Sequence, residues 1–178
     1  MNANSARLLA LLSAILAAAA MRLVPHPPNF TPVGAMALFS GAYFGRRGLA
    51  FVAPLGALLV SDLALGFYHG MATVYSSVVL IVLIGWALSK HRSFWRVGAA
   101  ALASSMLFYI VTNFGMWLSS GIYPHTLAGL EACYVAAIPF FQNTVAGDLV
   151  YSALLFGGFA LLLDAIPSLR DTPEPTPA

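Results

Sequence analysis

Six apolar runs, separated by short polar or proline-rich connections, occupy most of this chain of 178 residues. The runs comprise residues 8–21, 33–44, 48–65, 73–88, 97–118 and 145–166. Only 8% of the residues are charged, whereas soluble domains carry about 25%. A surface with so few charges needs lipid to cover it, and a helix in lipid satisfies its own backbone hydrogen bonds. The sequence therefore predicts an all-α membrane protein, a bundle of six transmembrane helices.

The domain organisation follows from the length of the chain and the position of its last apolar run. The length suits one domain, so we expect residues 1–166 to form a single transmembrane helical domain. Residues 167–178 contain four prolines and two acidic residues. Such a composition cannot bury an apolar core, and it predicts a disordered cytoplasmic tail.

The positions of the basic residues predict the orientation of the bundle. Six spans place both termini on one side of the membrane, and an excess of Lys and Arg marks the cytoplasmic side. With the N- and C-termini cytoplasmic, only Arg22 faces outward. The other basic residues then face the cytoplasm: Arg7, Arg46, Arg47, Lys90, Arg92, Arg96 and Arg170. We expect a multi-pass protein of a bacterial inner (cytoplasmic) membrane, with membrane lipid around it.

The first apolar run has two interpretations. Residues 8–21 are short for a span, and the alanines at 18–20 also fit the cleavage site of a secretory signal peptide. Against cleavage, Leu23 and Val24 extend the apolar stretch beyond Arg22, whose side chain can reach the interface. The sequence favours a retained first span.

One face of this first helix carries only small side chains. Ala10, Ala14 and Ala18 recur at every fourth residue, which places them on the same face. A flat face of this kind lets helices approach closely in lipid. It predicts either packing within the protein or docking on a partner helix.

Residues 22–32 (RLVPHPPNFTP) separate the first two runs and cannot form a continuous helix, because they contain four prolines. Thr31 and Pro32 suit the start of the next helix. The predicted topology places this stretch outside, together with the connection 119–134. We expect these two stretches to form a lid over an outer site.

Polar residues within the apolar runs are costly in lipid, so each is a candidate functional residue. Asp62, Asn113 and Asp148 lie in the outer parts of their runs, and Arg22 closes the first run on the same side. The inner half is apolar apart from the basic loops and Asp164. We therefore expect an outward-facing polar cup. Its predicted ligand-binding residues are Arg22, His26, Asn29, Asp62, Asn113, Tyr123, Tyr134, Asn143 and Asp148.

Each of these polar residues also has a structural interpretation. Arg22 either anchors an anionic group of a ligand or forms an ion pair with Asp62 or Asp148. Asn113 and Asp148 can instead bond to backbone groups that lack a helical partner. No H-x-x-x-H or C-x-x-C spacing occurs, so we predict neither a metal site nor a cofactor. The single cysteine, Cys133, excludes an internal disulfide.

The absence of other motifs limits the possible functions. The sequence contains no hydrolase elbow, P-loop or dinucleotide fingerprint, and no basic run of the kind that binds nucleic acid. The first hypothesis is uptake of a small ligand. The second is an enzyme acting on a lipid-linked substrate, with Asp62, Asp148 and His26 or His125 as acid and base. The third is a non-catalytic subunit of a membrane complex.

Several segments resemble a family of uncharacterised bacterial inner-membrane proteins that are described as transport proteins without an assigned substrate. The segments are RLVPHPPNFTP (22–32), ALFSGA (37–42), SD (61–62), TNF (112–114), YP (123–124), GL (129–130), CY (133–134), IPFF (138–141) and GD (147–148). The resemblance extends from residue 22 to the sixth run. It implies transport rather than an enzymatic reaction.

The architecture is also similar to the S components of energy-coupling-factor (ECF) transporters. Those proteins have six helices, cytoplasmic termini and a ligand site near the outer face that loops close. Their first helix docks on a transmembrane coupling subunit through an Ala-x-x-x-Ala face, a pattern that Ala10, Ala14 and Ala18 match. The similarity implies a vitamin-sized ligand, and as partners a coupling subunit with its ATPases.

Overall fold

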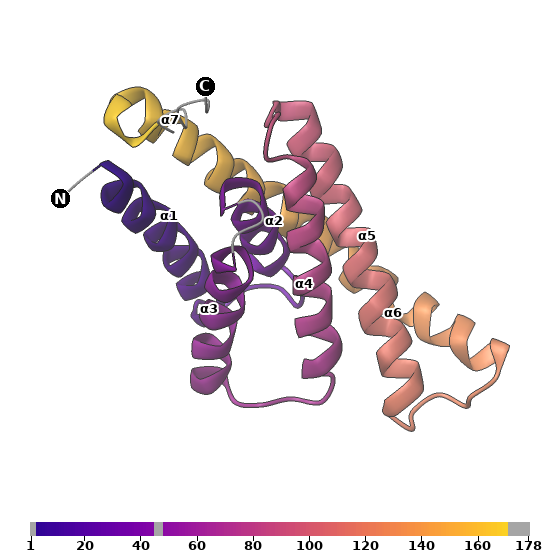
Figure 1. The fold of residues 1–178 in the computed structure, drawn as a ribbon. Helices are drawn as coiled ribbons and strands as arrows, with labels where there is room; N and C mark the ends of the chain where they lie inside the picture. Colours follow the sequence, from indigo (N-terminus) through magenta and orange to yellow (C-terminus); the bar gives the residue numbers. More distant parts are fainter. Residues whose placement is uncertain (1–2, 45–47, 171–178) are drawn as a thin grey trace.

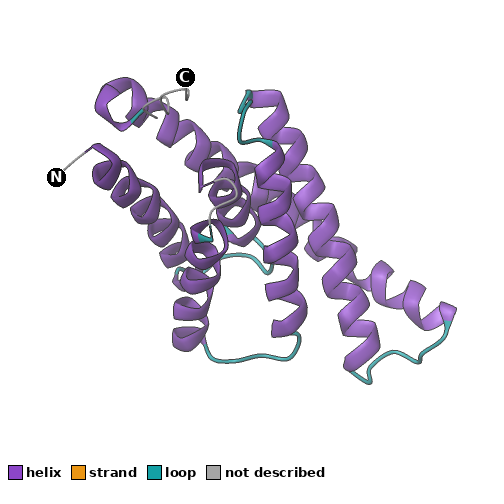
Figure 2. Ribbon diagram, in the orientation of Figure 1, coloured by secondary structure: helices purple, strands orange, loops and turns teal. Residues whose placement is uncertain are grey.

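The computed structural model describes residues 3–44 and 48–170, and this part of the chain is all-helical, without strands (Figures 1 and 2). The α-helices are α1 (Ala3–Ala20), α2 (Val33–Phe44), α3 (Leu49–Leu65), α4 (Met71–Ala87), α5 (Phe94–Ser119), α6 (Leu127–Ser152) and α7 (Gly158–Ala165). Shorter turns are the 3₁₀ helices η1 (Met21–Leu23) and η3 (Pro167–Leu169) and the π-helical turn η2 (Ala153–Gly157). The predicted all-α fold class is confirmed.

Three helices within these residues are long and apolar enough to cross a membrane. They are Asn4–Leu23, Phe94–Ser119 and the continuous helix Leu127–Ala165. The helices α2, α3 and α4 are apolar but shorter, with 12, 17 and 17 residues. A helix of 17 residues measures about 26 Å, somewhat less than the ~30 Å hydrocarbon core. Length and composition therefore support three spans, and the six-span topology stays a prediction.

The longest helix differs from the sequence-based expectation, because it includes residues assigned to the connection 119–134 as well as the sixth run, 145–166. Thr126 does cap the helix, since its hydroxyl accepts a hydrogen bond from the Gly129 N–H (3.2 Å). The helix then continues through η2 into α7. The polar residues at 142–144 do not break it, because Thr144 donates to the Phe140 carbonyl one turn earlier (3.1 Å).

The short helix α2 forms the centre of the fold. Every residue of α2 except Tyr43 is buried. It packs most closely against α4, where Gly41 and Gly85 face each other and a Cβ on either would overlap the backbone of the other helix. Because the start of α2 lies inside the protein, its first N–H groups need protein partners.

The connections between helices gather at two ends of the molecule. The start of α1, the end of α7 and the α4–α5 connection lie toward one end, and the α3–α4 and α5–α6 connections lie at the other (Figure 1). The stretch 24–32 does not reach that second end. It crosses the bundle beside the middle of the neighbouring helices (Figure 1). An irregular segment, most of whose residues are exposed, therefore lies against the side of the bundle.

The C-terminal stretch departs in part from the expected disordered tail. Leu169 in η3 is buried, and the Arg7 guanidinium donates to its carbonyl (2.8 Å). Arg170 forms an exposed ion pair with Asp164 (3.0 Å). Residues 167–170 are therefore attached to the helical domain through Leu169, and residues 171–178 lie outside the described part. Arg46 and Arg47, which contributed to the predicted orientation, also lie outside it.

Candidate functional site

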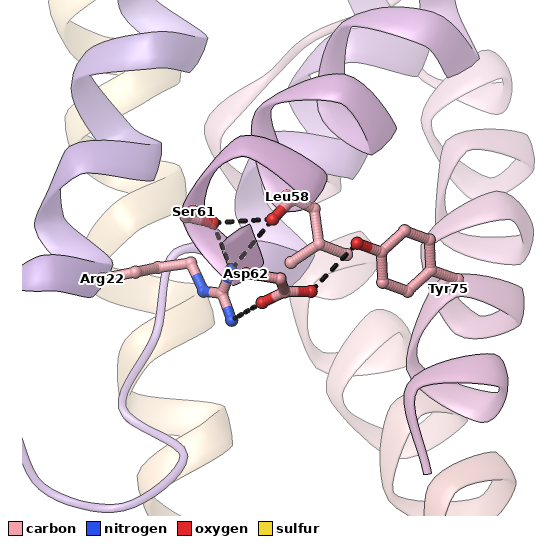
Figure 3. A network of polar contacts seen from close by, with 5 residues as sticks. All are labelled: Arg22, Leu58, Ser61, Asp62 and Tyr75. Atoms are coloured by element: carbon pink, nitrogen blue, oxygen red, sulfur yellow. Dashed lines mark hydrogen bonds and ion pairs between the residues drawn. The ribbon is translucent and has the colours of Figure 1, made fainter. Parts of the chain in front are cut away.

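The first polar region is an ion-pair network around Asp62, a residue with no exposed side-chain surface. The Arg22 guanidinium lies 2.7 Å from Asp62 Oδ1 and is itself 10% exposed. Nη1 of the same guanidinium donates to the Leu58 carbonyl (3.3 Å) and to the Ser61 hydroxyl. The Tyr75 hydroxyl donates to Asp62 Oδ2 (2.9 Å), so both carboxylate oxygens have partners (Figure 3).

This ion-pair network ties three elements together. Arg22 lies in η1 at the end of α1, Asp62 lies in the last turn of α3, and Tyr75 lies in the second turn of α4. Partial burial raises the pKa of Tyr68 in the α3–α4 connection, and the nearby Asp62 carboxylate adds to this shift. Of the two alternatives for Arg22, the structure has the ion pair with Asp62.

The second polar region centres on Asp148, whose side chain is buried in α6. The Ser105 hydroxyl donates to Asp148 Oδ2 (2.6 Å), and the backbone N–H of Ala35 donates to the same carboxylate. Ala35 is the third residue of α2, where N–H groups lack intrahelical partners and the helix dipole is positive. Asp148 therefore caps α2 from another helix. Gly34 makes this approach possible, since a Cβ there would overlap the carboxylate.

A small cavity adjoins Asp148 and shares lining residues with a second cavity, and we call the two the paired cavities. The smaller has a volume of about 30 Å³, and its lining includes Asp148, Gly34 and Thr31. The larger has a volume of about 70 Å³, and its lining includes Asn113 and aromatic side chains of α5 and α6. The residues that line both are Asn29, Phe108 and Thr144.

The stretch 24–32 forms one wall of the paired cavities and is attached to α6. The Asn143 side chain donates to the Pro28 carbonyl (2.9 Å), and the Phe30 ring lies 5.7 Å from that of Tyr151. Asn29 has a left-handed backbone conformation (φ 64°), which turns the chain over the cavities. Gly147 leaves room for the backbone of this stretch to lie against α6.

The structure distributes the nine predicted ligand-binding residues among several places. The paired cavities are lined by Asn29, Asn113 and Asp148, and Asn143 holds the wall. The ion-pair network contains Arg22 and Asp62. The remaining three line neither cavity: His26, Tyr123 and Tyr134. The single polar cup expected from the sequence is thus two separate regions.

Three of these residues bond to backbone carbonyl groups nearby, which gives each of them a structural role. Asn113 donates to the Tyr109 carbonyl one turn earlier (2.8 Å), while its side chain also lines the larger cavity. The Tyr134 hydroxyl donates to the Ile110 carbonyl (2.7 Å) and joins α6 to α5. The His26 ring contacts the neighbouring Pro27 carbonyl (2.9 Å). Only the first of these contacts lies at a cavity.

Residues that the sequence did not single out complete both regions. Tyr75 and Ser105 donate to the two buried aspartates, and Thr144 lines both cavities. Hydroxyl residues occur in apolar helices without a functional reason, because they bond to their own helix, as Thr144 does. The sequence signal is therefore weak, although Ser105 follows another serine within an apolar run.

The alanine face of α1 borders a third, apolar space. Ala10, Ala14 and Ala18 line a groove of about 390 Å³ between α1 and the C-terminal part of the long helix, together with Leu155 and Phe159. Ala18 is buried, and Ala10 and Ala14 are half-buried. The groove is distinct from the paired cavities.

The chemistry available at the site is that of binding by hydrogen bonds and one buried carboxylate. Among the described residues, no three His, Cys, Asp or Glu side chains lie close enough together to hold a metal ion. Asp62 and Asp148 belong to separate networks and face different partners. The paired cavities offer amide, hydroxyl, carboxylate and aromatic groups in one place.

The chain belongs to a protein family that is described as a family of unknown function (DUF6580), whose model matches residues 2–169. No curated protein matches the chain, and no solved structure matches it. The family match covers both polar regions and assigns no ligand to either of them.

Proposed function

We propose that this protein is a membrane transport protein, similar to an S component. It binds a small polar molecule in the paired cavities, and this molecule is then taken up. One observation carries this proposal: two neighbouring cavities share Asn29 in their lining, and Asp148 lines the smaller of them while Asn113 lines the larger. Polar groups that meet at a cavity inside an apolar bundle are typical of a ligand site.

The proposed topology has six spans in a bacterial inner membrane, with both termini cytoplasmic. The positions of the start of α1 and the end of α7 toward one end of the molecule support it (Figure 1). Large apolar side chains on the surface, such as Trp95 (82% exposed), support a lipid environment. In this topology α2 and the stretch 24–32 together make one span. Irregular backbone is tolerated at membrane depth where it lines a cavity.

The volumes of the cavities restrict the ligand. Sites for drug-sized molecules measure about 300–1,000 Å³, whereas the paired cavities measure about 30 and 70 Å³. In the described conformation the site suits a molecule of a few heavy atoms. A vitamin-sized ligand requires the stretch 24–32 to move away from α6, which breaks the hydrogen bond between Asn143 and Pro28.

We further propose that transport needs partner subunits, in the manner of ECF transporters. The partner would be a transmembrane coupling subunit, which is bound to ATPases. Its helix would enter the groove beside Ala10, Ala14 and Ala18, where small side chains allow close approach. The apolar lining of the groove and the spacing of the alanines support this assignment.

Two neighbouring alanines of α6 allow a direct test of the site. Ala137 is buried and lines the larger cavity, whereas Ala136 is exposed on the outer surface of the same helix. We expect native mass spectrometry to detect a small molecule that copurifies with the wild-type protein. Ala137→Leu fills the cavity and removes this molecule, and Ala136→Leu retains it.

The stability of the two variants serves as the control. Each must remain folded in detergent, as judged by a cooperative thermal transition. Retention of the small molecule by folded Ala137→Leu would show that the paired cavities are not its site. Loss of the small molecule from both variants would show that any larger side chain on α6 removes it. This result would also contradict the assignment of the paired cavities as the binding site.

A further inference from the structure

The charge balance around Asp148 indicates which class of ligand the paired cavities accept, an inference that rests on the proposed function. As a carboxylate, Asp148 accepts hydrogen bonds from the Ser105 hydroxyl and the Ala35 N–H. Burial favours the neutral acid, and both donors act against it by favouring the charged form, which a neighbouring ammonium group would stabilise further. The N-terminus of α2 contributes about half a positive charge, which leaves part of the negative charge uncompensated.

No basic side chain of the described residues lines either cavity. Arg22 pairs with Asp62, and the Arg92 guanidinium donates to the Ala42 carbonyl (2.9 Å). Arg170 pairs with Asp164. An anionic ligand would therefore face the Asp148 carboxylate without a cation to bind it, whereas a cationic ligand would complete the charge balance.

The aromatic lining also favours a cation attached to a short apolar group. Phe108 lies at both cavities, and Phe140 and Phe141 line the larger one. Aromatic faces attract ammonium groups and pack against methylene groups. A cavity needs a volume of about 10–15 Å³ to accommodate a water-sized group, so the smaller cavity, at about 30 Å³, has room for an ammonium group.

We propose that the paired cavities bind a short primary amine in its ammonium form. The ammonium group lies in the smaller cavity beside Asp148, where Asn29 and Thr144 supply further acceptors. The aliphatic chain of about two or three carbons extends into the larger cavity, between the phenyl rings. Asp148 both caps α2 and binds the ligand.

Three probes of equal chain length separate charge from shape: n-propylammonium, 1-propanol and propionate. Each is titrated into the purified full-length protein in detergent at neutral pH. Binding is measured by calorimetry and by the midpoint of thermal unfolding. We expect saturable binding and a rise in the midpoint with n-propylammonium, and neither effect with the alcohol or the carboxylate.

Two variants and a matched control test the residues. Asp148→Asn removes the charge, and we expect its affinity for n-propylammonium to fall by at least about tenfold. Asn29→Gly removes one acceptor but suits the left-handed backbone, so the protein remains folded while affinity falls several-fold. Asp164→Asn makes the same charge change at a residue that is 77% exposed in α7, and we expect unchanged binding.

The outcomes test the identity of the ligand as an amine separately from the location of the binding site. Binding of propionate or 1-propanol as tight as that of n-propylammonium, or full affinity in both Asp148→Asn and Asn29→Gly, overturns the amine assignment. So does the absence of binding by all three probes. If Ala137→Leu still removes the copurifying molecule in those cases, the proposed site stands. If it does not, the proposed function fails as well.

Discussion

The two polar regions of this protein are each built on a buried aspartate, and they differ in what balances its charge. Asp62 receives a hydroxyl hydrogen bond from Tyr75 and an ion pair from Arg22. Asp148 receives a hydroxyl hydrogen bond from Ser105 and a backbone N–H at the start of α2. Asp148 lines the smaller of the paired cavities, whereas Asp62 lines neither of them.

The difference separates a structural role from a binding role. A buried carboxylate with a guanidinium partner is neutral as a pair and has no further need of a cation. A carboxylate that only dipoles stabilise keeps part of its negative charge available to a ligand. The comparison therefore supports a structural role for the ion-pair network, and it supports the proposal that the paired cavities bind a ligand.

The largest effect is expected from Arg22→Met, which leaves the Asp62 charge buried without its partner. Breaking a buried pair in this way costs about 3–5 kcal/mol of unfolding free energy. Replacement of both partners, Arg22→Met with Asp62→Leu, should restore most of this loss. Unfolding in SDS, followed by circular dichroism, measures both variants.

Ligand binding provides the control for Arg22→Met. If the network is structural, the folded fraction of this variant binds the copurifying molecule with wild-type affinity. A folded Arg22→Met protein that has lost the ligand would place Arg22 in the binding site. It would also remove the distinction between the two regions.

Much of the fold could be predicted from the sequence, because apolar runs and helix breakers report it directly. The expected start of α2 at Val33 agrees with the structure, since Pro32 precedes this first helical residue. The continuity of the long helix could not be foreseen. Polar residues at 142–144 resemble a break, and only tertiary contacts, such as that of Asn143 with Pro28, show that the helix accommodates them.

The site could be predicted only in part, for a similar reason. Depth in the membrane suggested that Arg22, Asp62 and Asp148 lie at one level. It could not decide which aspartate pairs with Arg22, because both pairings bring together residues far apart in sequence. The role of Gly34 was equally hidden, since it depends on a carboxylate from another helix approaching its Cα.

An intermediate effect is expected from Gly34→Ala, which tests the role of Asp148 as the N-terminal cap of α2. The added methyl group overlaps the Asp148 carboxylate, so the side chain must shift away from the start of α2. We expect a loss of about 1–3 kcal/mol in unfolding free energy and weaker ligand binding. Gly56→Ala is the matched control, because nothing lies near its added methyl group. It should be neutral or gain up to about 1 kcal/mol.

The smallest effects come from removal of the two hydroxyl donors, in Ser105→Ala and Tyr75→Phe. Each variant removes one hydrogen bond to a buried aspartate, which is worth about 0.5–1.5 kcal/mol. After Tyr75→Phe, Asp62 still has its ion pair with Arg22. After Ser105→Ala, the Ala35 N–H is the one donor named above that remains for Asp148. We therefore expect Ser105→Ala to have the larger cost in SDS unfolding. A larger cost for Tyr75→Phe would mean that the ion pair does not compensate Asp62, and the proposed division between the two regions would lose its physical basis.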